Sequence, residues 1–89
     1  MDVRARIGWN LKRLREERGI TQEDFATDCR LDRGYVSGVE RGVRNPAVNS
    51  LVKMVTVLGV DIAELFDAAK AEEFSATYRP RRGRRKRER

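Results

Sequence analysis

Histidine is absent from this 89-residue sequence, cysteine occurs once and aromatic residues are few, and these shortages exclude several classes of function. Cys29 cannot form an internal disulfide, and without histidine there is no Cys/His cluster for a zinc site. No nucleophile–base arrangement is present, and the paired acids Glu16-Glu17 and Glu72-Glu73 are typical of solvated helix faces. We therefore expect a protein that is not an enzyme and that uses neither a metal nor another cofactor.

Long apolar runs are also absent. No run reaches the roughly 18 residues of a membrane span, and residues 1–6 lack the apolar stretch of a secretory signal. The lone cysteine fits a reducing compartment, so we expect a cytoplasmic protein without a membrane partner. A chain of this length has room for one domain. A domain so small is only marginally stable alone, which makes dimerisation a natural support.

The positive charge is concentrated at the C-terminal end. Residues 79–89 hold eight basic residues and one acid, a net charge of +7 within a total of +6. The other 78 residues hold 12 basic and 13 acidic residues, a net charge of −1. Basic composition alone therefore does not indicate that the folded part binds nucleic acid. We expect a folded domain over residues 1–71 and a basic, flexible tail over residues 72–89.

Apolar residues recur at helical spacing in five short segments separated by turn residues. The expected helices span about residues 3–18, 21–29, 33–41, 46–58 and 61–66. Thr21, Asp32 and Asp61 stand where they can cap the second, third and fifth of these helices. Beyond Ala69 the periodicity weakens, and no further helix is expected. The sequence therefore predicts an all-α fold of five short helices.

Residues 21–42 contain the parts of a helix-turn-helix, in which the second of two short helices enters the major groove of DNA. The small side chain of Ala26 allows the two helices to approach closely, and Leu31 fills the turn between them. The outward face of the second helix is expected to carry Arg33, Gly34, Tyr35, Ser37, Gly38 and Arg41. Two glycines cost helix stability, roughly 1 kcal/mol each relative to alanine. They also leave a flat surface that can press against base edges.

From Ile7 to Phe66, about two-thirds of the chain, the sequence resembles the Cro/phage-repressor family, also called the xenobiotic-response-element (XRE) family. The similar motifs are Leu11-Lys12-Arg13-Leu14-Arg15, Gly19-Ile20-Thr21-Gln22, the run from Tyr35 to Gly42, Arg44-Asn45-Pro46 and Leu58-Gly59-Val60. The run from Leu31 to Pro46 is especially similar to controller proteins of restriction–modification systems. The resemblance implies a five-helix, lambda-repressor-like helix-turn-helix domain, here followed by a basic C-terminal tail.

The resemblance also assigns base contacts. Arg33, Gly34, Tyr35 and Ser37 stand where family members meet DNA bases or the adjoining backbone, and an arginine can bind O6 and N7 of guanine together. Two alternatives remain open at these positions. Arg33 can be an exposed arginine that is simply solvated, and Tyr35 can pack over a neighbouring helix instead of touching DNA.

Other residues match the family's phosphate contacts and an internal ion pair. The phosphate contacts implied by the resemblance are Thr21, Gln22, Arg41, Arg44 and Asn45. The N-terminus of the helix that starts at Gln22 favours an anion. Arg15 and Glu40 match a pair that forms a largely buried salt bridge in the family, and we expect this pair to fix the orientation of the recognition helix.

Three positions depart from the family pattern. Gly34 stands where controller proteins commonly have a base-contacting threonine, so one contact that reads the DNA sequence is missing or is made by the backbone instead. Arg30 replaces the usual glycine of the turn, so a non-glycine residue is expected to adopt positive φ. Ala47 replaces the frequent serine cap of the fourth helix and leaves Asn45 as a substitute cap.

The family commonly dimerises through the fifth helix and nearby residues. This region is rich in apolar side chains, more than so short a helix can bury in its own core. They are Val60, Ile62, Leu65, Phe66 and Ala69. We expect a homodimer on pseudo-palindromic double-stranded DNA at the nucleoid, with recognition helices about 34 Å apart. Such a dimer regulates transcription by blocking or recruiting RNA polymerase.

Two rival functions remain open. An antitoxin or bridging protein can use the same fold to hold a protein partner, and the arginine-rich tail can direct binding to RNA. The tail residues Arg81, Arg82, Arg84 and Arg85 are expected to add a nucleic-acid contact or to serve as a disordered, solubilising end. Arg82-Gly83-Arg84 also resembles the centre of an AT-hook that enters a narrow minor groove. Unlike an AT-hook, this core is preceded by Pro80 and followed by no proline.

Overall fold

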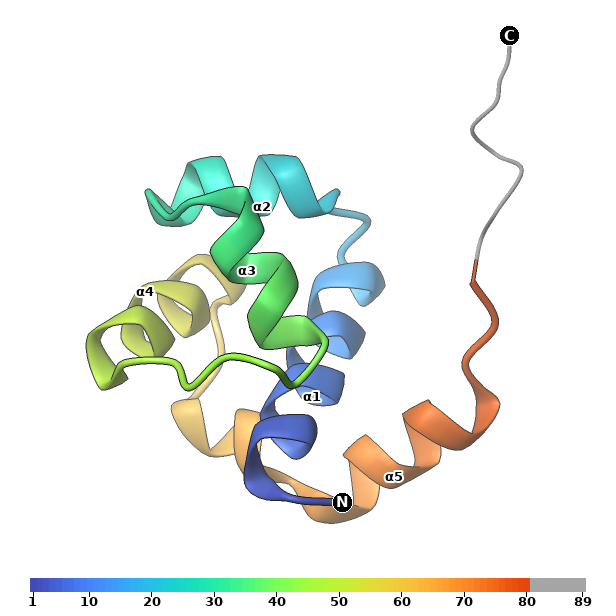
Figure 1. The fold of residues 1–89 in the computed structure, drawn as a ribbon. Helices are drawn as coiled ribbons and strands as arrows, with labels where there is room; N and C mark the ends of the chain where they lie inside the picture. Colours follow the sequence, from blue (N-terminus) through green and yellow to red (C-terminus); the bar gives the residue numbers. More distant parts are fainter. Residues whose placement is uncertain (81–89) are drawn as a thin grey trace, which may run out of the picture.

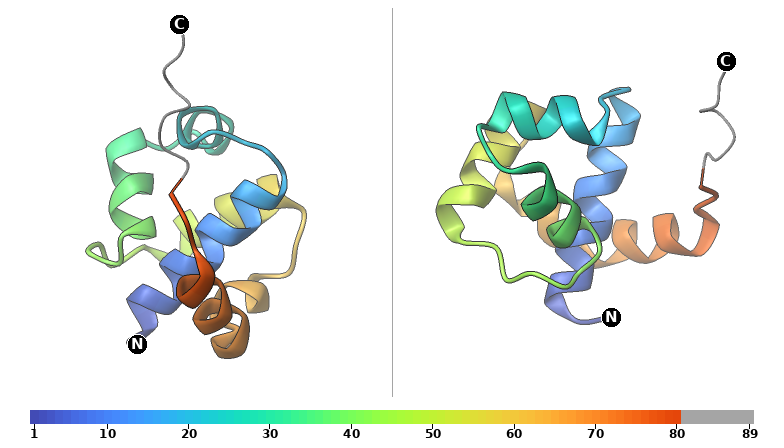
Figure 2. Two further views of the ribbon diagram at one scale, coloured as in Figure 1. Left: turned by 90° about the vertical axis from the view of Figure 1, so that its right-hand side faces the viewer. Right: turned by 45° about the horizontal axis from the view of Figure 1, so that its top comes forward.

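The computed structural model describes residues 1–80, which fold into helices joined by short connections (Figure 1). The elements are α1 (Val3–Glu17), α2 (Gln22–Cys29), α3 (Arg33–Glu40), α4 (Val48–Leu58), the 3-10 helix η1 (Ile62–Phe66) and α5 (Ala68–Thr77). Helix α1 is the central element, since it packs against α3, η1 and α5, while α2 packs against α3 and α4. Figure 2 shows α5 and α3 on different sides of α1. The predicted all-α helix-turn-helix fold is confirmed.

Helix starts follow the predicted caps. The side chains of Thr21, Asp32 and Asp61 each accept a hydrogen bond from a backbone N–H in the first turn of the next helix. Arg30 has φ of 60°, as expected of the residue that replaces glycine in the turn. Asn45 does not act as expected, because the N-cap position of α4 is Ala47 and no side chain makes a capping hydrogen bond there.

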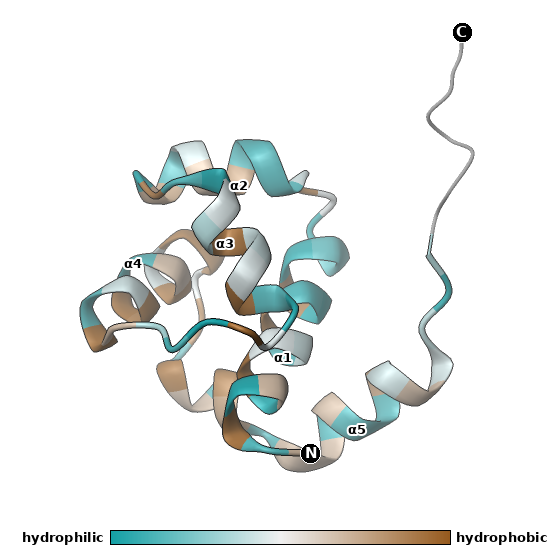
Figure 3. Cartoon of the chain, in the orientation of Figure 1, coloured by the Kyte–Doolittle hydropathy of each residue, from teal (hydrophilic) through white to brown (hydrophobic). Residues whose placement is uncertain are grey.

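The core is made by one face of each helix, and α2, which turns its other side to solvent, is coloured mainly as hydrophilic in Figure 3. Among the buried side chains, Leu11, Phe25, Val36, Met54 and Leu65 are fully enclosed. Residues 1–80 include no helix that is long and apolar enough to cross a bilayer.

The C-terminal part of the fold differs from the prediction. Residues 62–66 form a 3-10 helix, and α5 is an additional helix that continues beyond residue 71, the expected boundary of the tail. The periodicity of α5 is weak because only Ala71 is buried completely. The rest of its packing comes from two half-buried rings near its end, which a search for a broad apolar face does not detect.

Aromatic rings hold α5 against α1. The ring of Trp9 lies edge-on to the rings of Phe74 and Tyr78, with centroid distances of 5.9 and 5.6 Å. The ammonium of Lys12 lies 4.6 Å from the centroid of Tyr78, and the Tyr78 hydroxyl donates a 3.3 Å hydrogen bond to Glu16. These contacts join segments more than sixty residues apart in the sequence.

A buried asparagine fixes the turn between η1 and α5. Asn10 is fully enclosed, and its side-chain Nδ2 donates 3.0 Å hydrogen bonds to the carbonyl oxygens of Leu65 and Asp67. Its Oδ1 accepts from the guanidinium of Arg13. Burying an amide without partners would cost free energy, and here both ends of the amide are paired.

Candidate nucleic-acid interface

The turn between α2 and α3 is closed by backbone and apolar contacts. The N–H of Leu31 donates to the carbonyl of Ala26 at 2.9 Å, and Leu31 packs against the core beside the buried Ala26. Asp32 then caps α3 by accepting from the N–H of Tyr35 at 3.2 Å. The expected helix-turn-helix geometry is therefore present, with α3 running at a steep angle to α2 (Figure 1).

Helix α3 also lies very close to α1. A Cβ at Gly8 would stand only 2.5 Å from the carbonyl oxygens of Val39 and Glu40. Real side chains do not tolerate such a distance, so glycine is needed here for the backbones of α1 and α3 to meet. The last turn of α3 therefore has little freedom to move relative to α1.

A buried ion pair joins the same two helices. The carboxylate of Glu40 accepts from Nε of Arg15 at 2.6 Å and from its second terminal nitrogen at 3.0 Å. The Glu40 side chain is 1% exposed and that of Arg15 is 9% exposed. Arg15 also donates to the carbonyl of Ile20 at 2.8 Å, which ties in the connection before α2. The structure thus contains the expected pair as a two-pronged contact that fixes α3 relative to α1.

The outward face of α3 presents Arg33, Gly34 and Arg41 to solvent, with Ser37 half-buried between them. Arg41 donates from Nε to the hydroxyl of Ser37 at 3.3 Å. Within residues 1–80, the Arg33 guanidinium has neither a hydrogen bond nor an ion pair. It projects from the first turn of α3, so it is available to a ligand.

Gly38 is not part of the exposed face, contrary to the prediction. It is buried, and a Cβ at this position would lie 2.5 Å from Cγ of Arg44. The stem of Arg44 crosses α3 at Gly38, and its guanidinium carbon lies 5.7 Å from the ring centroid of Tyr35. The flat surface is therefore covered by an arginine of the next loop.

Tyr35 is half-buried, and its hydroxyl accepts a 3.1 Å hydrogen bond from the N–H of Ala47 at the start of α4. This contact agrees with the alternative in which Tyr35 packs over a neighbouring helix. Asn45, in the same loop, is exposed.

The residues expected to bind phosphate at the start of α2 have internal partners. The half-buried Gln22 donates from Nε2 to Glu40 at 3.1 Å, and the Thr21 hydroxyl accepts from the N–H of Asp24 at 3.0 Å. Glu23 and Asp24 place negative charge in the first turn. An anion here would rely on the free backbone N–H groups of the helix end.

The expected dimer surface is only partly available. Phe66 is 39% exposed, Ala69 is exposed, and Val60 and Ile62 are half-buried. Leu65 is fully buried in the core of its own chain, so its assignment to a dimer interface is wrong. Four of the five residues of η1 are exposed or half-buried, and Leu65 is the one that the 3-10 helix turns completely inward.

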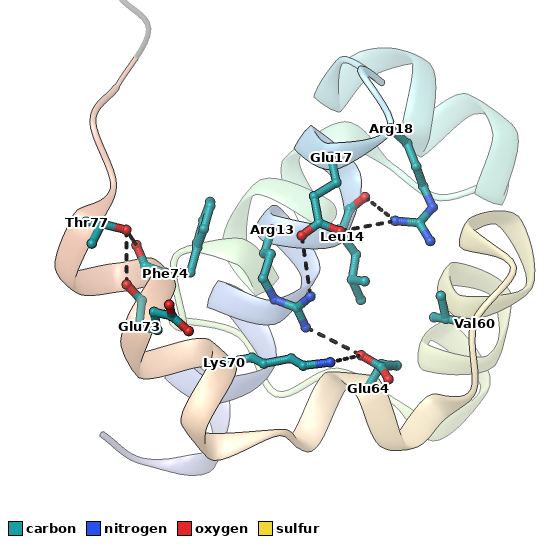
Figure 4. Close-up of a pocket in the computed structure, with 10 residues that line it drawn as sticks. All are labelled: Arg13, Leu14, Glu17, Arg18, Val60, Glu64, Lys70, Glu73, Phe74 and Thr77. Atoms are coloured by element: carbon teal, nitrogen blue, oxygen red, sulfur yellow. Dashed lines mark hydrogen bonds and ion pairs between the residues drawn. The ribbon is translucent and has the colours of Figure 1, made fainter.

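A cleft of about 560 Å³ lies away from α3, between α1, η1 and α5 (Figure 4). Arg13 spans it, with its guanidinium 3.7 Å from both Glu17 and Glu64, and Lys70 lies 3.6 Å from Glu64. The side chains around the cleft carry balanced charge, and all of the charged ones except Glu73 pair with one another. No residue of α2 or α3 lines this cleft, so it is separate from the face of α3 that is expected to contact DNA.

Cys29 packs into the core at the end of α2, with Sγ 3.9 Å from the carbonyl oxygen of Lys53. Burial raises the pKa of its thiol from 9.0 to about 11. The thiol is therefore protonated at neutral pH and behaves as a small apolar side chain, as expected. The expected tail contacts Arg81, Arg82, Arg84 and Arg85 lie outside the described residues.

Comparison with known proteins identifies the family. The helix-turn-helix family profile matches residues 11–65. Control protein C.MunI from a Mycoplasma species is 40% identical over 72 residues, which cover 80% of this chain and 97% of that protein. The crystal structure of the restriction-modification controller protein C.AhdI from Aeromonas hydrophila has 41% identity and a TM-score of 0.69, covering 71% of this chain and 96% of that one. The hypothetical transcription factor NHTF from Neisseria has 37% identity and a TM-score of 0.74, covering 85% and 86%. Since more than half of the chain matches, this protein belongs to the helix-turn-helix family, and its expected similarity to restriction–modification controller proteins is confirmed.

Proposed function

We propose that this protein is a transcription regulator that binds a pseudo-palindromic operator as a homodimer, with α3 of each subunit in the major groove. The observation that supports this most directly is Arg33. Its guanidinium is exposed and has no partner within residues 1–80, yet it stands on a helix fixed to α1 by a buried ion pair. A free side chain on a rigid support is what direct reading of a base requires.

Operator selection followed by mutation tests this assignment. Duplexes bound by the wild-type protein are selected from a random pool, and Arg33→Ala is then titrated against selected and random duplexes by mobility shift. Loss of a bidentate guanine contact should weaken binding to the selected duplex by about 10- to 100-fold with little effect on random DNA. Lys70→Ala on α5, which removes the same charge far from α3, is the matched control and should change neither affinity.

An unchanged preference in Arg33→Ala would contradict base reading by α3. The same experiment addresses the rival interaction-module function, which predicts no selected duplex at all. The relatives do not favour that rival, because their names describe transcription regulators and control proteins.

Dimerisation supplies the second half-site contact. The exposed part of Phe66, with Ala69 and the half-buried Val60 and Ile62, forms the apolar surface that we assign to the subunit interface. Phe66→Glu should convert the dimer to a monomer in analytical ultracentrifugation and weaken operator binding by more than about 100-fold, because one half-site contact is lost. A monomeric wild-type protein with full operator affinity would contradict the assignment.

Residues 79–89, with a net charge of +7, provide an auxiliary contact to DNA phosphates. Deletion of residues 79–89 should lower the affinity for all duplexes and flatten its dependence on salt while the selected sequence stays preferred. Complete loss of preference would favour the tail-directed alternative.

The regulator acts in the cytoplasm and is associated with the nucleoid when it is bound to DNA. Whether the bound dimer blocks or recruits RNA polymerase then depends on the position of the operator relative to the promoter.

A further inference from the structure

Gly38 occupies a position where even a methyl group would collide with Arg44. A Cβ there would lie 2.5 Å from Cγ, 3.3 Å from Nε and 3.4 Å from Cδ of the Arg44 side chain. Gly38 lies inside α3 and has no positive φ, so its backbone does not require glycine. Alanine would favour the helix by its intrinsic propensity. The neighbouring arginine, and not the backbone, therefore accounts for the glycine.

The loop that carries Arg44 is fastened to α3 at both ends. The N–H of Val43 donates to the carbonyl of Gly38 at 3.0 Å, and the N–H of Ala47 donates to the hydroxyl of Tyr35 at 3.1 Å. Between these bonds the stem of Arg44 crosses Gly38, and its guanidinium lies over the ring of Tyr35. The side chain is thus held along its length while the residue as a whole remains exposed.

We propose that Gly38 is a positioning residue for DNA binding, because its lack of a side chain lets Arg44 lie against α3 with the guanidinium directed to a DNA phosphate. This inference rests on the proposed function and adds a residue that does not itself touch DNA. An arginine side chain that moves freely loses rotamer entropy when it binds. Holding the stem in advance reduces that loss, and the planar guanidinium suits both the aromatic ring and the phosphate.

Gly38→Ala tests the inference directly. The variant should bind the duplex selected by the wild-type protein about fivefold to tenfold more weakly, because the new methyl group displaces Arg44 from its place. The melting temperature of the free protein should stay unchanged or rise, since the only close contact is a side chain on an exposed loop. Weaker binding together with undiminished stability separates a positioning role from damage to the fold.

Arg44→Ala supplies the matched background. In a protein that already lacks the arginine, Gly38→Ala should cause no further loss of affinity, because the two changes remove the same contact. Wild-type affinity in Gly38→Ala would overturn the inference. Equal losses with and without Arg44 would also overturn it, and would indicate that Gly38 presses against DNA itself.

Arg44→Lys keeps the inference testable if Gly38→Ala fails to fold. Lysine retains the charge but lacks the planar group that lies on Tyr35, so its affinity should be close to that of Arg44→Ala. Wild-type affinity in Arg44→Lys would show that a fixed guanidinium is unnecessary. Arg33→Ala serves as the separate test of the proposed function, because loss of sequence preference in that variant does not depend on Gly38 or Arg44.

Discussion

Helix α1 is joined to α3 and to α5 by contacts of opposite character. The contact with α3 is polar and buried, made by Arg15 and Glu40 beside the close backbone approach at Gly8. The contact with α5 is aromatic and half-exposed, made around Trp9. The contact with α3 requires one specific geometry, because each buried charge must be paired with the other in the absence of water. The contact with α5 depends on apolar area and tolerates adjustment.

The difference indicates what each contact is for. A recognition helix must keep its angle to the rest of the protein when it enters the groove, and a two-pronged buried ion pair supplies such an angle. Helix α5 has only to stay attached to α1, and aromatic rings can pack favourably at several different angles between their planes. Mutations should therefore affect the two contacts differently in size and in kind.

The largest effect is expected from Glu40→Ala. It leaves the buried guanidinium of Arg15 without its main partner and removes the acceptor of Gln22. Breaking a buried pair on one side should lower the free energy of unfolding by about 3–5 kcal/mol. Urea denaturation followed by circular dichroism measures this loss.

The exposed Glu17 provides the control for that change. It also pairs with an arginine, Arg13, at 3.7 Å, but its side chain is 56% exposed. Glu17→Ala should cost less than about 0.5 kcal/mol, because solvent screens the pair. Similar losses in the two variants would contradict the view that burial makes the α1–α3 contact decisive.

A smaller effect is expected from Trp9→Ala, which removes the ring shared by Phe74 and Tyr78. The loss should be about 2 kcal/mol, below that for a fully buried aromatic side chain because Trp9 is half-buried. Hydrogen exchange should increase mainly in α5, while amides of α2 and α3 keep their protection relative to global unfolding. Uniform loss of protection across all helices would show that α5 is part of the same cooperative unit as the recognition helix.

The same contrast separates the contacts that could be predicted from the sequence from those that could not. The contact between α1 and α3 can be predicted from the sequence, because caps and apolar spacing define the helices and the family resemblance pairs Arg15 with Glu40. The sequence does not predict helix α5, because the helix is attached by rings far apart in the sequence and by one buried alanine. The roles of Asn10 and Gly38 also depend on atoms supplied by other segments, carbonyls 55 and 57 residues away and the stem of Arg44. No local pattern contains that information.

Tyr78→Phe should have a still smaller effect. The change removes the 3.3 Å hydrogen bond to Glu16 but keeps the ring that contacts Trp9 and Lys12. A long bond at a partly exposed site should contribute only about 0.5 kcal/mol. Urea denaturation of Tyr78→Phe beside Tyr78→Ala measures the two parts, and the alanine variant should lose clearly more. Equal losses would mean that the hydroxyl, and not the ring, attaches α5.

The smallest effect is expected at Asp2, which caps the helix that both contacts share. The N–H of Ala5 donates to its carboxylate at 2.9 Å, and this bond, aided by Arg4, lowers the pKa of Asp2 below 3.8. The folded protein therefore favours the charged form of Asp2. The cap contributes its full stabilisation at pH values above the unfolded-state pKa, and this stabilisation is lost as the pH falls through the lowered pKa of the folded state. Asp2→Asn, which can still cap, should remove this part of the acid dependence of unfolding between pH 5 and pH 2 while changing stability little at pH 7. Urea midpoints measured across that range compare the variant with the wild type, and equally steep curves for both would assign the acid sensitivity to groups deeper in the fold.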